Sequence, residues 1–212
     1  FWIKIGRALP NYGFRLDDHT AFIRAGNLKP KFGFKREGFI FSPLANIPGI
    51  VEVGIYPIEG LFFTASIANS YINGNAIYNK EDVINKNLAA KINYNFALFN
   101  NWKATITPSF MKEKDIQLTG MSLGISNRKF VWLWELDNAK NWLSDNITSR
   151  AIYHEVEYDI VNGVQLLGKY DYFDQDISIK NGAIHRFTAG IEIFPLNIMG
   201  IMILARLTSL DN

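Results

Sequence analysis

The residues best suited to chemistry are carboxylates that alternate along one stretch of the chain. Glu155, Glu157 and Asp159 stand two residues apart, and Lys169 and Asp171 follow after a short Asn-Gly turn. Residues two apart on a strand share a face, so these five side chains line one wall and can pair across the turn. Such a row can attract cations or act as a catalytic acid pair. A solvated, cross-paired wall is the more ordinary interpretation.

Catalysis finds little support elsewhere in the chain. The histidines are His19, His154 and His185, and the last two fall on the apolar face of their predicted strands, without a serine at the spacing of a Ser-His pair. The chain contains no cysteine, which excludes disulfides and thiolate metal sites, and it has no Gly-rich phosphate loop or haem-attachment motif. We therefore expect no enzyme activity, no metal and no cofactor.

A second polar cluster, Asp17, Asp18, His19 and Arg24, lies in the irregular stretch 14–48. If the strands of the chain close into a barrel, as argued below, one hypothesis is that this stretch folds into the lumen. There the opposed charges would narrow the pore and set a transverse field. The alternative is that an aspartate caps a short helix and the histidine satisfies a neighbour. A metal site is disfavoured, because one histidine and two adjacent aspartates point in different directions.

The elements that must position these groups are long strands. Apolar residues alternate with Ala, Lys and Asn from Leu88 to Leu98, and alternation resumes from Trp102 to Phe110 after an Asn100-Asn101 turn. Each arm has about ten residues, the length that a tilted strand needs to cross a bilayer. The apolar face carries no charge and has aromatics near the turn, as expected of a surface that contacts lipid.

The same pattern recurs in five hairpins with short turns at one end and longer polar connections at the other. It predicts an all-β, transmembrane antiparallel up-and-down β-barrel of the outer-membrane type, with about twelve strands, in one domain spanning 1–212. A soluble sandwich or lipocalin-like barrel, with the apolar face inward, is the alternative. The predicted strands are 1–5, 32–41, 50–56, 61–69, 87–99, 102–111, 116–126, 130–137, 147–160, 164–173, 183–194 and 201–208.

The polar face of these strands would line the pore, with six basic and eight acidic side chains. This mixture favours a weak preference for cations. The predicted lining residues are Lys4, Glu52, Lys91, Lys103, Glu135, Asp137, Glu155, Glu157, Asp159, Lys169, Asp171, Arg186, Glu192 and Arg206.

Composition limits the partners. The 22 basic and 20 acidic residues are interspersed, so no clustered cationic surface for nucleic acid is predicted. No apolar run approaches the roughly 18 residues of a membrane helix, so a bilayer would be crossed by strands.

Three segments, Ile3 to Arg7, Leu9 to Phe14 and His19 to Arg24, together with Gly190 to Asn197, resemble phosphate-selective porins of the O/P type. The resemblance implies a porin in the bacterial outer membrane, with an N-terminal portion missing here from a barrel of about 16 strands. Those porins line their pores with basic rows, whereas the lining predicted here is mixed, so phosphate selectivity is not expected.

Two functions follow as hypotheses. The first is an outer-membrane channel for passive diffusion of small hydrophilic solutes or ions, in contact with outer-membrane lipid and able to form a homo-oligomer such as a trimer. The alternative is a structural or docking barrel that sheathes or anchors an envelope protein partner. Neither involves nucleic acid.

Overall fold

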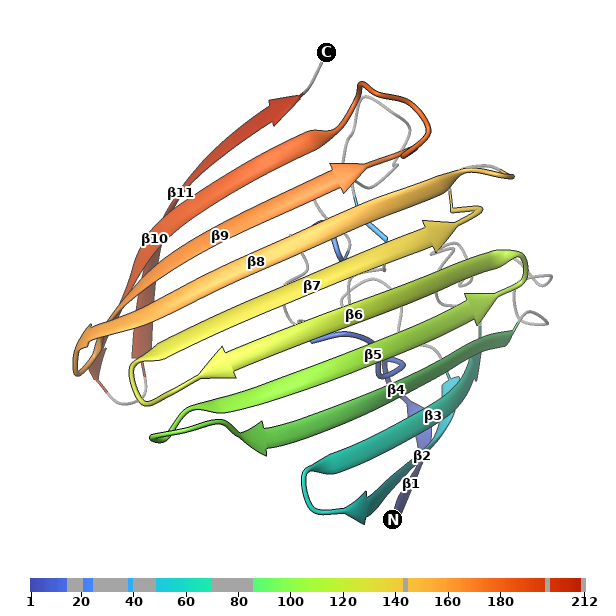
Figure 1. Cartoon of the computed structure of the whole chain (residues 1–212), viewed down its shortest axis with the longest axis horizontal. Helices are drawn as coiled ribbons and strands as arrows, with labels where there is room; N and C mark the ends of the chain where they lie inside the picture. The colour runs from blue at the N-terminus through green and yellow to red at the C-terminus, as the bar shows by residue number, and fades with distance from the viewer. Residues whose placement is uncertain are drawn as a thin grey trace.

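The computed structural model describes residues 1–14, 21–24, 38–39, 49–69, 86–142, 145–196 and 199–210. These residues include a single antiparallel sheet whose eleven strands follow one another in chain order (Figure 1). The strands are β1 (Trp2–Arg7), β2 (Gly49–Ile58), β3 (Leu61–Asn69), β4 (Lys86–Ala97), β5 (Lys103–Glu113), β6 (Ile116–Ser126), β7 (Phe130–Lys140), β8 (Thr148–Val161), β9 (Val164–Asp174), β10 (Ile184–Leu196) and β11 (Met199–Leu210).

The prediction of an all-β, up-and-down antiparallel architecture is confirmed, with two differences. Eleven strands are present in the described ranges rather than about twelve. The predicted strand 32–41 lies outside the described residues except for Gly38 and Phe39, which belong to no strand. In this part of the chain no helix is long and apolar enough to cross a membrane.

The turn chemistry explains the hairpins. Asn100 and Asn101 both have positive φ, 42° and 69°, which suits the twist of a tight hairpin, and the Trp102 N–H donates to the Phe99 carbonyl at 2.8 Å. Asparagine tolerates this region better than most residues, so the sequence places the turn correctly.

The sequence predicts short turns at one end of the sheet and longer connections at the other, and this prediction is only partly right. Lys114 and Asp115 make a two-residue turn between β5 and β6, at the end where longer connections were predicted. The predicted strands 183–194 and 201–208 leave a turn of six residues, which is too long, since β10 runs to Leu196 and β11 begins at Met199. We call the end with residues 59–60, 127–129 and 162–163 the short-turn end, and the opposite end the long-loop end.

The two faces of the sheet differ as the alternation predicts. Met121 is 41% exposed on the outer face of β6, whereas the next residue, Ser122, is fully buried on the inner face. Aromatic side chains contact one another across the outer face near the short turns, for example Trp102 and Phe130 with centroids 5.7 Å apart. An exposed apolar outer face with an aromatic belt, backed by polar inner side chains such as Ser122, is the pattern of a transmembrane β-barrel wall.

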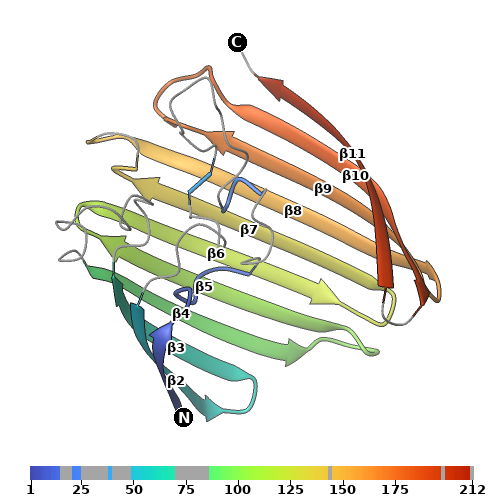
Figure 2. The ribbon, with the colours of Figure 1, turned by 180° about the vertical axis from the view of Figure 1, so that it is seen from behind.

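The sheet curls, so that β1 to β3 and β10 to β11 turn toward the side on which residues 8–14 and 21–24 lie (Figures 1 and 2). That side is the inner face. The described parts of the connection between β1 and β2 therefore lie inside the curve of the sheet.

The orientation of the outer face can be tested by placing a charge on it. We expect Val156→Arg, at an exposed outer position of β8, to lower the free energy of unfolding in lipid bilayers by about 2–4 kcal/mol. The control Gln165→Arg puts the same charge on the inner face beside Glu157 and Asp159 and should cost far less. Denaturant titration in lipid vesicles measures both, and equal costs would contradict the assignment of the faces.

Candidate functional site

The inner face holds a segment of the connection between β1 and β2. We use the name inner segment for its described parts, Leu9 to Phe14, Ala21 to Arg24, and Gly38 with Phe39. Backbone amides of this segment donate to side chains of the wall: Gly13 to Ser109 Oγ at 3.0 Å, and Phe14 to Glu135 Oε2 at 2.7 Å. The segment is thus attached to the wall by directed hydrogen bonds as well as by packing.

Arg24 forms the centre of this attachment. Its guanidinium lies 2.9 Å from Glu135 Oε1 and 3.6 Å from Asp137 Oδ2, and all three side chains are almost completely buried. Tyr12 adds a hydrogen bond from its hydroxyl to Asp137 Oδ1 at 2.9 Å. A buried charge without a partner is very costly, so two carboxylates on β7 fix where Arg24 must lie.

Burial and nearby carboxylates also shift the pKa values of Tyr12 and Arg24 in the inner segment. The pKa of Tyr12 is raised well above its usual value, first by burial and then by the Asp137 and Glu135 carboxylates. Burial works to lower the pKa of Arg24, but the same two carboxylates outweigh it and leave the pKa above its usual value. Tyr12 therefore stays protonated as a donor and Arg24 stays charged as the partner of both carboxylates.

Gly13 is the residue that lets the segment approach the wall. Its φ is +59°, and a Cβ built there would lie 2.1 Å from Glu135 Oε1 and 2.3 Å from Arg24 Nη2. Any side chain at this position would enter the space that the ion pair occupies. Glycine is therefore needed both for its backbone conformation and for its lack of a side chain.

The inner face near the long-loop end is apolar, which the sequence analysis did not predict. Phe22, Ile23 and Phe39 of the inner segment pack there into one cluster with side chains from seven strands. Phe39 meets Phe173 with ring centroids 5.4 Å apart. The buried wall residues of this cluster are Ala89, Met111, Ile116, Leu118, Ala139, Ala151, Tyr153, Phe173 and Ile184. The expectation of a wet inner face is wrong at this end.

Several predicted lining residues contact the inner segment or a neighbouring strand. Lys91 donates to the Gly13 carbonyl at 2.6 Å, and Asp171 accepts from the Phe22 N–H at 3.2 Å. The Arg186 guanidinium lies over the Phe22 ring, 4.1 Å from its centroid.

Two further ion pairs join neighbouring strands on the inner face. Lys4 pairs with the buried Glu52 at 2.7 Å, and Lys169 pairs with the buried Glu155 at 2.8 Å. All four residues lie on the inner face, as the alternation predicts. Glu52 and Glu155 are buried, however, and do not contact open solvent.

The inner face near the short-turn end is polar and reached by water. Gln165 donates to Glu157 and Asp159, each at 3.3 Å, and Glu192 lies beside Gln165 in the register of β9 and β10. Lys103 is exposed on β5. The inner wall is thus divided into a dry half toward the long loops and a wet half toward the short turns.

The remaining predicted residues divide into two groups. Asp17, Asp18 and His19 of the predicted constriction lie outside the described residues, and so does the side chain of Arg206, whose backbone pairs with Thr188. His154 and His185 lie on the outer face, where the Tyr170 hydroxyl is 2.9 Å from His185 Nδ1. In the described ranges no group of three or more His, Cys, Asp or Glu side chains is placed to hold a metal ion.

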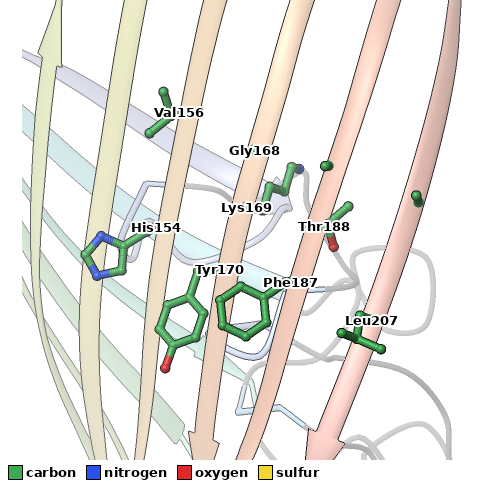
Figure 3. A pocket seen from close by; sticks show the side chains of 10 residues that line it. His154, Val156, Gly168, Lys169, Tyr170, Phe187, Thr188 and Leu207 are labelled. Carbon is green, nitrogen blue, oxygen red and sulfur yellow. The ribbon is translucent and has the colours of Figure 1, made fainter.

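An open groove of about 590 Å³ crosses β8 to β11. Figure 3 shows His154, Tyr170 and Phe187 side by side on neighbouring strands, next to Gly168. Gly168 pairs with Val156 and Ala189, and Ala189 pairs with Ala205, so small side chains form the floor of the groove beside the bulky row. Its outer-face position and apolar lining suit contact with hydrocarbon rather than with a polar solute.

Comparisons with known proteins do not assign the chain to a family. No family model matches the chain, and no curated protein matches it. Among solved structures, a KdgM porin in complex with disordered oligogalacturonate is similar over 78% of this chain and 86% of its own, with a TM-score of 0.40 and 5% identity. So distant a likeness carries no weight in assigning a function.

The role of Gly13 can be tested directly. We expect Gly13→Ala to separate Arg24 from Glu135 and to lower the free energy of unfolding by about 3 kcal/mol, the cost typical of breaking a buried ion pair. Trypsin should then cut at Arg24 faster than in the unaltered protein. The control is Gly168→Ala, where an added Cβ meets nothing within 4 Å. Equal trypsin sensitivity of the two variants would contradict the proposed attachment.

Proposed function

We propose that the chain forms a passive channel in the outer membrane of a bacterium, through which small hydrophilic solutes or ions diffuse. The observation that carries this proposal is the contrast between the exposed apolar outer face and the polar, water-reached inner face near the short turns. Such a wall separates lipid from water, and no covalent chemistry is needed for diffusion along it.

The inner segment would set the width of the path. It covers the inner face toward the long loops through Arg24, Tyr12 and the apolar cluster, so a solute would pass beside it before reaching the wet half. The predicted constriction by Asp17, Asp18, His19 and Arg24 belongs to this proposal, with Arg24 acting as the attachment to β7.

The sheet would require more strands to close. Among the described strands β1 and β11 are the two edges, and eleven antiparallel strands leave these two running in the same direction. An antiparallel seam therefore needs at least one further strand, in line with the expectation of a larger barrel. Phosphate selectivity is not part of the proposal, because acidic side chains outnumber basic ones among the predicted lining residues.

A second candidate is a docking barrel that encloses or anchors an envelope partner. It is favoured by the inner segment, which already fills part of the space that the sheet surrounds. In this case the wet half of the inner face would contact a partner protein rather than a stream of solute.

Conductance in a planar bilayer distinguishes the two. We expect the purified, folded protein to produce ohmic steps in potassium chloride, because the polar inner wall supports a continuous column of water. Trypsin digestion of the same preparation reports whether the barrel is folded. A folded protein that inserts without conducting would contradict the channel and favour the docking barrel.

The direction of ion selectivity is a further prediction. The double variant Glu157→Gln, Asp159→Asn removes both carboxylates. It should lower the cation-to-anion permeability ratio about twofold to fivefold, since a unit charge near the path is worth up to ~1 kcal/mol in water. The reversal potential across a salt gradient measures this ratio. Asp174→Asn, which removes a carboxylate bonded to Tyr172 on the outer face, is the control and should leave the potential unchanged. An unchanged potential in the double variant would remove these carboxylates from the ion path.

A further inference from the structure

Three aromatic side chains stack on the inner wall near the short turns. The Phe62 ring of β3 lies 4.6 Å from Tyr56 of β2 and 6.3 Å from Trp2 of β1, with interplanar angles of 23° and 27°. Phe62 therefore occupies the middle of a column whose ends are Trp2 and Tyr56. We call these three residues the aromatic column.

The alternation of each strand places the column on the inner face. Trp2 is two residues from Lys4, whose partner Glu52 also accepts a hydrogen bond from the Asn11 N–H of the inner segment at 3.2 Å. Tyr56 lies four residues after Glu52 on β2, on the same side of the strand. The column is therefore separate from the aromatic belt of the outer face.

The wall is built to hold the column in place. A Cβ added at Gly54 would lie 2.4 Å from the Trp2 indole, so the glycine leaves the room in which the indole rests against β2. Tyr56, at the other end, is 64% exposed. An aromatic ring that is left open to water on a polar wall, and stacked on a second ring behind it, is a surface for stacking.

Fixed amide groups lie beside the column. Asn93 is the register partner of Phe62, and its Nδ2 donates to Asn95 Oδ1 at 3.2 Å. Thr105 also donates to Asn95 Oδ1, at 2.6 Å, and Thr107 donates to Asn93 Oδ1. The carboxamide oxygens are thus occupied within the wall, and the exposed Asn95 offers its Nδ2 as a donor.

This combination fits one chemical class of ligand. A sugar ring has an apolar C–H face that packs on an aromatic ring and a rim of hydroxyl groups that accept and donate hydrogen bonds. The ammonium of Lys4 lies 5.2 Å from the Trp2 ring but is already paired with Glu52, so the column itself favours a neutral ring over an anionic one. Building on the channel proposed above, we propose that the aromatic column, with Asn93 and Asn95, binds the rings of neutral carbohydrates in the lumen.

The test measures binding apart from transport. The folded protein in detergent micelles is titrated with maltotriose, and intrinsic fluorescence is recorded for the unaltered protein and for Trp2→Phe, which isolates the signal of Trp2 from the other tryptophans. We expect a saturable change that is lost or strongly reduced in Trp2→Phe. Isothermal titration calorimetry then supplies affinities without relying on tryptophan.

Variants localise the site. Tyr56→Ala should weaken maltotriose binding at least about fivefold, since stacking on one aromatic side chain is worth ~1–3 kcal/mol. The matched control is Tyr158→Ala, which removes a tyrosine that is 46% exposed on the outer face, and its affinity should be unchanged. Absence of saturable binding, equal losses in the two variants, or tighter binding of an acidic trisaccharide of the same size would each overturn the proposal.

Failure of this site and failure of the channel give different results. A protein that conducts potassium chloride but does not bind maltotriose refutes the sugar site alone. A protein that binds maltotriose through Tyr56 but never conducts refutes the channel and leaves the binding site in place.

Discussion

The structure depends on how its backbone hydrogen bonds are satisfied. In the described part of the chain, each of the eleven strands bonds to its neighbours in sequence in antiparallel ladders, so the backbone needs no water along the paired edges. Side chains are then free to differ between the two faces, and their alternation decides which face meets hydrocarbon and which meets water. A shift of one residue in register would move Met121 inward and Ser122 outward, which explains why the polarity pattern specifies the register so strongly.

The inner face is organised by a second constraint, the cost of burying charge. Glu135 and Asp137 are buried on β7, and Arg24 supplies the opposite charge from a distant part of the chain. Removing either side of this cluster would leave a charge without compensation in a dry place. The same cluster fixes the position of Phe22 and Ile23 next to it, so apolar packing toward the long loops and ion pairing at mid-wall support each other.

Much of the fold could be predicted because the signals are local. Asn100-Asn101 and Asn162-Gly163 are turn residues by their own conformational preferences, and a period of two identifies the strands between turns. The turn at Lys114 and Asp115 is shorter than predicted, since periodicity does not mark the last residue of a strand. The start of β11 at Met199 was mispredicted because Pro195 and Gly200, which favour turns, lie within β10 and β11.

The candidate site was less predictable because it depends on contacts between distant residues. Placing Arg24 in a narrowing loop followed from its charged neighbours, but its pairing with β7 spans more than a hundred residues of sequence. The dry half of the inner face did leave a signal: Met111, Leu118 and Phe173 are apolar at positions where alternation demands inward side chains. Together, these positions indicate that an apolar segment packs against the inner face of the sheet.

The outer face of the sheet should meet lipid, and the inner face should meet water toward the short turns. The chain has no cysteine, so single cysteines at Ile92 and Asn93, neighbours on β4, can carry spin labels in lipid vesicles without background. We expect the label at Ile92 to be relaxed mainly by oxygen dissolved in the bilayer and the label at Asn93 mainly by a water-soluble nickel chelate. The reverse order, in a protein that stays monomeric without detergent, would contradict it.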